Sequence, residues 1–233
     1  QKYNKMKKLS ILFSILCLTY ACKAPQTASK TDNSKKTNEN IEHEVLISTS
    51  MGDMVVKLYN GTPQHRDNFL KLVNEKFYDS LLFHRVISGF MIQGGDPQSK
   101  NAAAGVMLGM GDVGYTIPAE FVDTLFHKKG ALCAARTPNP QKASSGCQFY
   151  IVQGRVMTND QVQMLESQRG IVLSAKQKEA YTTIGGTPQL DRDYTVYGEV
   201  IKGLDVLDKI ASVKTAPGDR PVEDVRMKMK LIK

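Results

Sequence analysis

Short stretches in which apolar and polar residues alternate recur along the chain, and this pattern is typical of β-strands. The first two stretches, 45–50 and 54–59, flank Met51-Gly52-Asp53 and predict a hairpin. The last stretch, 225–232, alternates apolar with basic residues, which indicates a strand with one exposed face. Further short strands are predicted at 83–96, 116–121, 131–135, 148–153 and 194–201.

Apolar residues recur at helical spacing in two places that lie far apart in the sequence. The first helix is predicted to begin at Thr62-Pro63, with Thr62 as its cap. Its apolar face comprises Phe69, Leu72, Val73 and Phe77, and that of the second helix comprises Leu204, Leu207, Ile210 and Ala211. About eight strands with two helices predict a mainly β fold, a closed antiparallel eight-stranded barrel capped by the two helices.

The start of the chain has the pattern of an export signal. Residues 1–21 place basic residues before an apolar run, Leu9 to Leu18, that is too short to span a bilayer, and this predicts a signal peptide. The following Ala21-Cys22 resembles the bacterial lipobox, so we expect Cys22 to be lipidated. The alternatives are cleavage near Ala21 that leaves a free Cys22 thiol, or an anchor that is not cleaved.

Residues 22–43 contain almost no apolar side chains, so they cannot bury enough surface to offset the entropy of ordering. We therefore expect a disordered tether at 22–43 and a folded domain at 44–233. The pattern predicts an exported, monomeric lipoprotein that is anchored in the membrane through its lipid and faces the periplasm or the cell surface.

The net charge of +8 suggests nucleic acid as a partner only at first sight. Residues 1–21 contain four lysines and no acidic residue. The net positive charge of the remaining chain is therefore about half as large. The remaining sequence has no basic run with interleaved aromatic residues, and nucleic-acid binding is not expected.

One stretch is long and irregular enough to indicate a family. Residues 83–96, FHRVISGFMIQGGD, resemble the signature of the cyclophilin family of peptidyl-prolyl cis-trans isomerases. Segments similar to other motifs of that family follow in the same order, GALCAAR at 130–136, SGCQFYI at 145–151 and YTVYGEV at 194–200. The resemblance covers about residues 44–233. It implies the same barrel and isomerisation of proline-containing unfolded or flexible protein segments, with no cofactor.

The resemblance also implies a substrate site, position by position. Arg85 matches the catalytic arginine, and the walls of the proline pocket match Phe90, Met91, Tyr150 and Leu190. The groups that bind the substrate backbone match Gln93, Gln148, Ala135 and the main chain of Arg136. Tyr194, also in the binding site, stands where many eukaryotic members have His, and Gln189 stands where they have Trp. Strong binding of cyclosporin is therefore not expected.

An arginine suits this chemistry. The X–Pro bond rotates over a barrier of about 20 kcal/mol because the nitrogen lone pair is conjugated with the carbonyl. An N–H group of Arg85 at the prolyl nitrogen would favour the lone pair localised in the twisted state. The alternative for Arg85 is a surface ion pair. The alternatives for the whole domain are a module that binds proline loops without turnover and a holdase chaperone.

Residues 154–187 depart from the smaller members of the family, which have a short loop there. Within them, 161–168 and 175–182 are predicted to be helical, so the barrel is expected to carry a helical insertion at about 154–187.

The cysteines and histidines of the domain suggest no further chemistry. Cys133 and Cys147 lie on predicted strands, and an exported protein could join them in a disulfide. The family has small buried residues at these positions, which favours free thiols instead. His43, His65 and His127 are not clustered with other ligands, so no metal site is expected.

Overall fold

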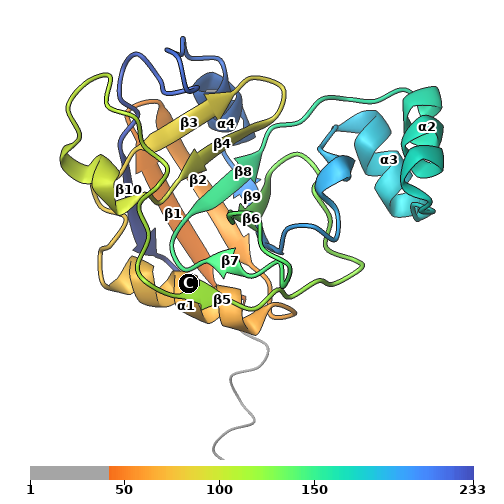
Figure 1. The fold of residues 1–233 in the computed structure, drawn as a ribbon, viewed down its shortest axis with the longest axis horizontal. Coiled ribbons are helices and arrows are strands. Elements are labelled where there is room, and N and C mark those ends of the chain that lie inside the picture. The colour runs from red at the N-terminus through yellow and green to blue at the C-terminus, as the bar shows by residue number, and fades with distance from the viewer. Residues whose placement is uncertain (1–41) are drawn as a thin grey trace, which may run out of the picture. The chain divides into compact units, whose positions relative to one another are not determined.

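The computed structural model describes residues 42–233 (Figure 1). The predicted signal peptide (1–21), the predicted lipidation site Cys22 and all but the last two residues of the predicted tether (22–43) lie outside the described residues. None of the helices formed by residues 42–233 combines the length and apolar run needed to cross a bilayer.

An antiparallel sheet of eight strands forms the body of the domain, in the order β10-β1-β2-β9-β6-β8-β4-β3. Its strands are β1 (Glu44–Thr49), β2 (Gly52–Leu58), β3 (Phe83–Ile87), β4 (Met91–Gly94), β6 (Ala131–Ala134), β8 (Phe149–Val152), β9 (Val196–Lys202) and β10 (Met227–Leu231). A separate pair consists of β5 (Thr116–Ile117) and β7 (Ser144–Ser145). The predicted hairpin of the first two strands is confirmed, because β1 pairs with β2 through Thr49 and Gly52.

The prediction of a closed barrel is wrong, because the sheet is open between its edge strands β3 and β10. In place of a ladder, the described chain has an isolated bridge from Leu82 to Arg226 and scattered backbone hydrogen bonds. The irregular chain beside β3 contains Pro217 and Pro221, which have no N–H group to donate to a ladder. The sheet is therefore a strongly curved half-barrel.

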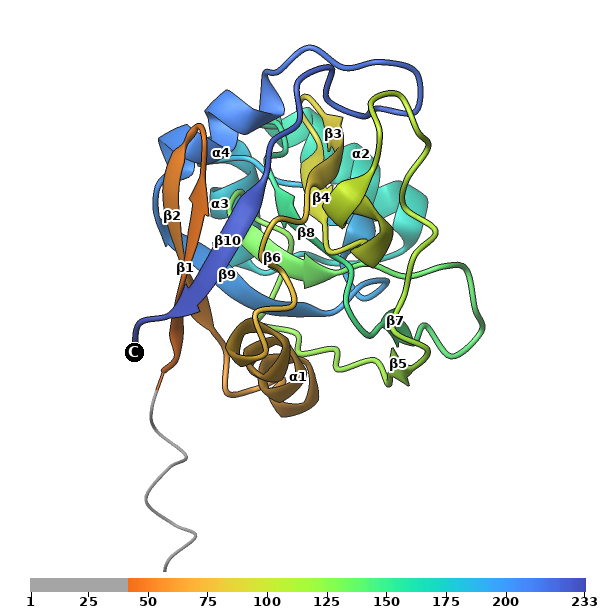
Figure 2. The same cartoon turned by 90° about the vertical axis from the view of Figure 1, so that its left-hand side faces the viewer.

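Two helices lie at opposite ends of this sheet, α1 (Pro63–Asn74) and α4 (Leu204–Ala211) (Figure 2). Thr62 is the residue before α1, but its side chain does not cap the helix. The carboxylate of Glu120 instead accepts the backbone N–H groups of Gln64 at 3.1 Å and His65 at 3.0 Å. Glu120 had been predicted to lie on a strand, which in fact ends at Ile117 because Pro118 follows it.

Both helices predicted within residues 154–187 are present, as α2 (Asn159–Arg169) and α3 (Ala175–Thr183). We call residues 154–187 the two-helix segment; it stands beside the sheet in Figure 1. Each helix begins with a capping box, Thr158 with Gln161 and Ser174 with Gln177, so the segment has well-defined helix starts.

Both cysteines of the described domain are free and buried. Cys133 lies on β6, and Cys147 lies just before β8. Burial raises the pKa of the Cys147 thiol to about 11 and that of Cys133 well above its usual range. The structure thus has the free thiols that the sequence favoured over a disulfide.

Candidate active site

A cavity of about 290 Å³ opens on the sheet where β3, β4 and β8 run side by side. Nine of the ten residues predicted for the substrate site line it: Arg85, Phe90, Met91, Gln93, Ala135, Arg136, Tyr150, Leu190 and Tyr194. The tenth, Gln148, lines an adjoining cavity of about 130 Å³ that shares Gln93, Ala135 and Arg136 with the first. The structure therefore brings together predicted residues that are as far apart in the sequence as Arg85 and Tyr194.

Strand pairing aligns the central residues of this cavity. Arg85 of β3 is the cross-strand partner of Gln93 of β4, and Gln93 is the partner of Tyr150 of β8. Directly paired residues point to the same face of a sheet, so the three side chains form a row across three strands. The row places a cation, an amide and an aromatic ring next to one another.

A tight turn brings Phe90 to the rim of the same cavity. The turn passes through Gly89, whose φ of 74° lies in the left-handed region. The backbone N–H of Gly89 donates to the side-chain oxygen of Gln153 at 2.6 Å. This conformation favours glycine, whereas the nearest neighbour of an added Cβ atom would be the flexible side chain of Arg155.

The polar side of the cavity is a chain of hydrogen bonds. Nη1 of Arg85 donates to Oε1 of Gln93 at 3.4 Å, and Nε2 of Gln93 donates to Oε1 of Gln148 at 3.0 Å. Nε2 of Gln148 in turn donates to the carbonyl oxygens of Gly109 and Gly111 at 2.9 and 2.7 Å. Because each amide is held at both ends, the oxygen and nitrogen of Gln93 and Gln148 have defined orientations.

Arg85 also forms the ion pair that was its alternative interpretation. Its Nε lies 3.3 Å from Oδ2 of Asp219, and the two side chains are 42% and 44% exposed. A pair this exposed stabilises a fold by little, since water screens it and ordering two side chains costs entropy. The pair orients the guanidinium and leaves most of its five donors open to other partners.

The aromatic side of the cavity is fixed by a buried hydrogen-bond network. The hydroxyl of Tyr150 lies 2.9 Å from Nε2 of His127, and Nδ1 of His127 lies 2.8 Å from Oδ1 of Asp191. Oδ2 of Asp191 accepts the hydroxyl of Tyr181 at 2.6 Å. Since the carboxylate accepts the Nδ1 proton, Nε2 is free to accept the hydroxyl of Tyr150. Tyr181 belongs to α3, so the network joins the two-helix segment to the wall of the cavity.

Sequence reasoning missed this network. His127 was noted as a histidine without clustered ligands, and Tyr181 was not singled out within the helix predicted at 175–182. Burial raises the pKa of Tyr150 and of Tyr181 well above the usual range, so both hydroxyls keep their protons and act as donors. The available signal was Asp191, which directly follows Leu190 of the predicted site.

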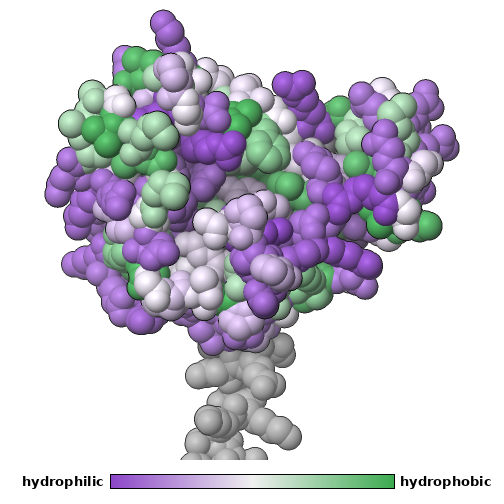
Figure 3. Space-filling model, in the orientation of Figure 1, coloured by the Kyte–Doolittle hydropathy of each residue, from purple (hydrophilic) through white to green (hydrophobic). Residues whose placement is uncertain are grey.

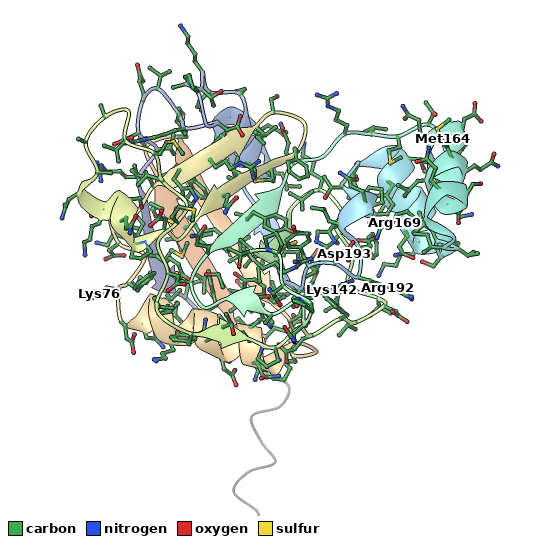
Figure 4. All side chains as sticks on the ribbon, viewed as in Figure 1. Lys76, Lys142, Met164, Arg169, Arg192 and Asp193 are labelled. Carbon is green, nitrogen blue, oxygen red and sulfur yellow. The ribbon has the colours of Figure 1, made fainter. Side chains whose placement is uncertain are left out.

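At the mouth of the cavity, charged side chains join the half-barrel to the two-helix segment. The guanidinium of Arg136 lies over the ring of Tyr194 at 4.6 Å. The carboxylate of Asp193 is 2.5 Å from Nζ of Lys142 and 3.0 Å from Nη2 of Arg169 (Figure 4). The same junction is hydrophilic in the space-filling view of Figure 3. Arg136, predicted as a main-chain contact, thus also contributes its side chain.

Residues 42–233 contain no group of three or more His, Cys, Asp or Glu side chains placed to hold a metal ion.

Comparison with known proteins places these features in a family. The model of the cyclophilin type peptidyl-prolyl cis-trans isomerase/CLD family matches residues 44–230. A protein of Staphylococcus aureus (strain USA300), provisionally assigned as a peptidyl-prolyl cis-trans isomerase, is 38% identical over 189 residues, which are 79% of this chain and 88% of that protein.

A longer relative occurs in Streptococcus pyogenes serotype M6. It is provisionally assigned as a bifunctional phosphatase/peptidyl-prolyl cis-trans isomerase and is 38% identical over 186 residues. The match takes in 78% of this chain but 37% of the streptococcal protein, so the chain spans little more than a third of that relative.

Solved structures show the same fold at lower identity. The crystal structure of a Cryptosporidium parvum cyclophilin type peptidyl-prolyl cis-trans isomerase has a TM-score of 0.58 and 22% identity, and the match covers 83% of this chain and 99% of that one. A second structure of that protein, determined in the presence of the dipeptide Ala-Pro, has the same TM-score at 21% identity. By its family match, its relatives and its half-barrel fold, the chain belongs to the cyclophilin-type peptidyl-prolyl cis-trans isomerases.

Proposed function

We propose that the 290 Å³ cavity is the isomerase site and that Arg85 is its catalytic residue. The observation that carries this proposal is the row of Arg85, Gln93 and Tyr150, because it sets a donor-rich cation beside an apolar pocket. Phe90, Met91 and Leu190 complete walls that suit a proline ring.

In this proposal the domain lowers the barrier by binding the twisted state of the X–Pro bond. The planar bond resists rotation by about 20 kcal/mol, since conjugation is lost at the halfway point. The prolyl nitrogen then carries a localised lone pair, which an N–H of Arg85 can bind. This interaction is absent from the planar ground state, so it accelerates the reaction. The reaction forms and breaks no covalent bond.

Other residues would hold the substrate on both sides of the rotating bond. Gln93 and Gln148, with the backbone at Ala135 and Arg136, offer amide and main-chain groups to the substrate backbone. The proline ring would stay fixed against Met91 while the carbonyl side turns. Because the proline ring is held, the motion of the bound substrate is restricted to rotation about the X–Pro bond.

Replacing the catalytic arginine tests the proposal. We expect Arg85→Ala to lower kcat/KM for a proline tetrapeptide at least about tenfold, which is about 1.4 kcal/mol of transition-state stabilisation. The melting temperature should change little, because the ion pair with Asp219 is exposed. Arg192→Ala is the matched control, since Arg192 is an exposed arginine in an ion pair with Asp123.

An Arg85→Ala variant with the turnover of the wild type would overturn the mechanism. A wild type that binds the proline peptide but does not accelerate its isomerisation would instead favour the proline-binding module. A holdase would suppress aggregation of unfolded chains equally well with and without Arg85.

We also propose that the protein assists folding of exported proteins from a membrane anchor. The support is the short apolar run that ends at Ala21-Cys22 and the polar stretch that follows it. Lipidation of Cys22 would hold the domain near newly exported chains. A single acyl chain anchors only marginally, so the proposal requires a lipid modification with several chains.

Mass spectrometry of the mature N-terminus tests this part. We expect a lipidated Cys22, and we expect Cys22→Ser to move the protein from the membrane fraction to the soluble fraction. Cys17→Ser, which changes a cysteine inside the apolar run, is the matched control and should stay in the membrane fraction. An unmodified Cys22 in the mature protein would contradict lipidation.

A further inference from the structure

A second and larger hollow lies on the far side of Tyr194 from the isomerase cavity. Its volume is about 770 Å³, compared with about 290 Å³ for the first. One wall is the chain at 120–126, and the other is the connection from α2 to α3. We call this hollow the accessory groove; its apolar lining includes Phe121, Val122, Leu125, Ile171 and Val172.

Apolar side chains are unusually exposed along the accessory groove. Val172 is 89% exposed and Phe121 is 40% exposed, and they belong to opposite walls. Phe126 and Leu173 lie buried at its base. An exposed apolar surface that is hollowed and continuous marks a binding surface more often than scattered apolar residues do.

Most of the charged residues at the edge of the groove have partners within the protein. Arg192 pairs with Asp123 at 2.9 Å, and Arg169 pairs with Asp193 at 3.0 Å (Figure 4). Because these charges are already compensated, an additional charged ligand would gain little from them. Apart from the ammonium of Lys176, the part of the lining that has no partner is mainly apolar.

Tyr194 makes the groove continuous with the isomerase cavity, since its side chain lines both. Its ring packs against Tyr150 at 5.8 Å on the pocket side and beneath Arg136. A polypeptide whose proline lies in the cavity can therefore pass over Tyr194 into the groove without leaving the protein surface.

We infer that the accessory groove binds an apolar side chain of the same polypeptide whose proline occupies the isomerase cavity. This inference rests on the proposed function and names its substrate class: unfolded chains that carry an apolar residue a few positions from the proline. Folded proteins bury such residues, so the groove selects chains that have not completed folding. The contact lies away from the rotating bond and is the same in ground and transition states, so it lowers KM and leaves kcat unchanged.

The experiment compares a proline tetrapeptide with the same tetrapeptide extended by eight residues on each side. In the extended peptides a single Leu is placed at successive distances from the proline, in a background of Ser and Gly. With the full-length wild type, we expect one or two Leu positions to raise kcat/KM about fivefold over the all-polar extension, as the transfer of one buried Leu allows.

Val172→Asp is the diagnostic variant, because its exposed side chain makes folding insensitive to the change. We expect it to abolish the fivefold gain through a higher KM while kcat/KM for the tetrapeptide stays the same. Phe121→Ser should do the same from the opposite wall. Met164→Asp is the matched control, since Met164 is 60% exposed on α2 and does not line the groove (Figure 4).

Failure of the inference and failure of the proposed function give different results. A wild type that does not accelerate the tetrapeptide would overturn the proposed function, and the inference with it. A wild type that accelerates all peptides equally, whatever the position of Leu, would overturn the inference alone. A concentration-dependent dimer that Val172→Asp dissociates would assign the groove to a second copy of the chain and would also overturn the inference.

Discussion

The rings of Phe69, Tyr78 and Phe149 are at most 2% exposed and pack with centroids 5.1 to 5.8 Å apart inside the half-barrel. The two-helix segment has a much smaller apolar cluster, in which Val162, Leu173 and Tyr181 pack with Phe126. The sheet is thus stabilised by a large apolar cluster, whereas the segment combines a small one with helix caps and polar bonds.

This difference matters for the isomerase cavity, because the cavity uses both regions. Its polar side, with Arg85 and Gln93, stands on strands of the buried sheet. Its aromatic side is connected to the segment through Asp191 and Tyr181. The comparison teaches that hydrogen bonds hold the side chains of both walls on the packed sheet, and that those of the aromatic wall continue into the segment.

The largest expected difference concerns core truncation. Phe149→Ala should lower the free energy of unfolding by about 3 to 5 kcal/mol, because it removes a ring from a tightly packed cluster. Val162→Ala removes two carbons from a small cluster and should cost about 1.5 kcal/mol. Urea denaturation of the two variants measures both values. Equal losses would break the comparison, since they would show the segment to be as tightly packed as the sheet.

Acid should also weaken the sheet through His84, which is 2% exposed on β3. Burial lowers its pKa from 6.5 to about 4, with help from the positive charges of Arg85 and Arg220. Between these values the unfolded chain binds more protons than the folded one, so stability falls as the pH drops from 6.5 to 4. The loss attributable to this residue is about 3 kcal/mol, and it is absent above pH 6.5.

The contribution of His84 is measured as a difference between two profiles. Carboxylates that titrate in the same range contribute to the profiles of the wild type and of His84→Asn, so they cancel in the difference. Only the wild type loses stability through His84, so the unfolding free energies measured in urea should converge as the pH falls toward 4. Parallel profiles across this range would show that His84 is not the group responsible.

The smallest expected effect concerns the hydrogen-bond network that joins the two-helix segment to the cavity. Tyr181→Phe removes the hydroxyl that donates to Asp191, and losing this buried hydrogen bond should cost about 1 to 3 kcal/mol of stability. Because Asp191 orients His127 and His127 orients Tyr150, we expect kcat/KM on a tetrapeptide to fall about fivefold, equivalent to about 1 kcal/mol. Isomerisation assays and thermal unfolding measure the two effects.

Tyr115→Phe is the matched control, since the hydroxyl of Tyr115 donates to Asn68 at an exposed position. It should change neither stability nor turnover noticeably. If Tyr181→Phe keeps full activity while losing stability, the network supports the segment alone and does not position Tyr150.

The residues predicted for the site line one cavity, and most of them lie in dense local motifs. Arg85 and Gln93 lie in one motif, and the alternation within it already separated the faces of the strand. The stretch 83–96 was predicted as one strand, because alternation alone does not show that the chain turns back at Gly89. The hairpin follows from the pairing of β3 with β4, which depends on where the two strands find partners.

The closed barrel was predicted wrongly for a related reason. Eight strands and two capping helices are consistent with a closed or an open sheet, and closure depends on whether the edges β3 and β10 meet in register. Pro217 and Pro221 lie far in sequence from β3, so their effect on that edge was not visible from the local pattern.

By itself, the sequence determined most of the strands and helices and indicated residues that line the 290 Å³ cavity, because periodicity and motifs are local properties. The tertiary structure decided that His127, Asp191 and Tyr181 form one network, and that Tyr194 lines both the cavity and the accessory groove. These relations join residues up to tens of positions apart, and which polar groups find partners depends on what is buried together.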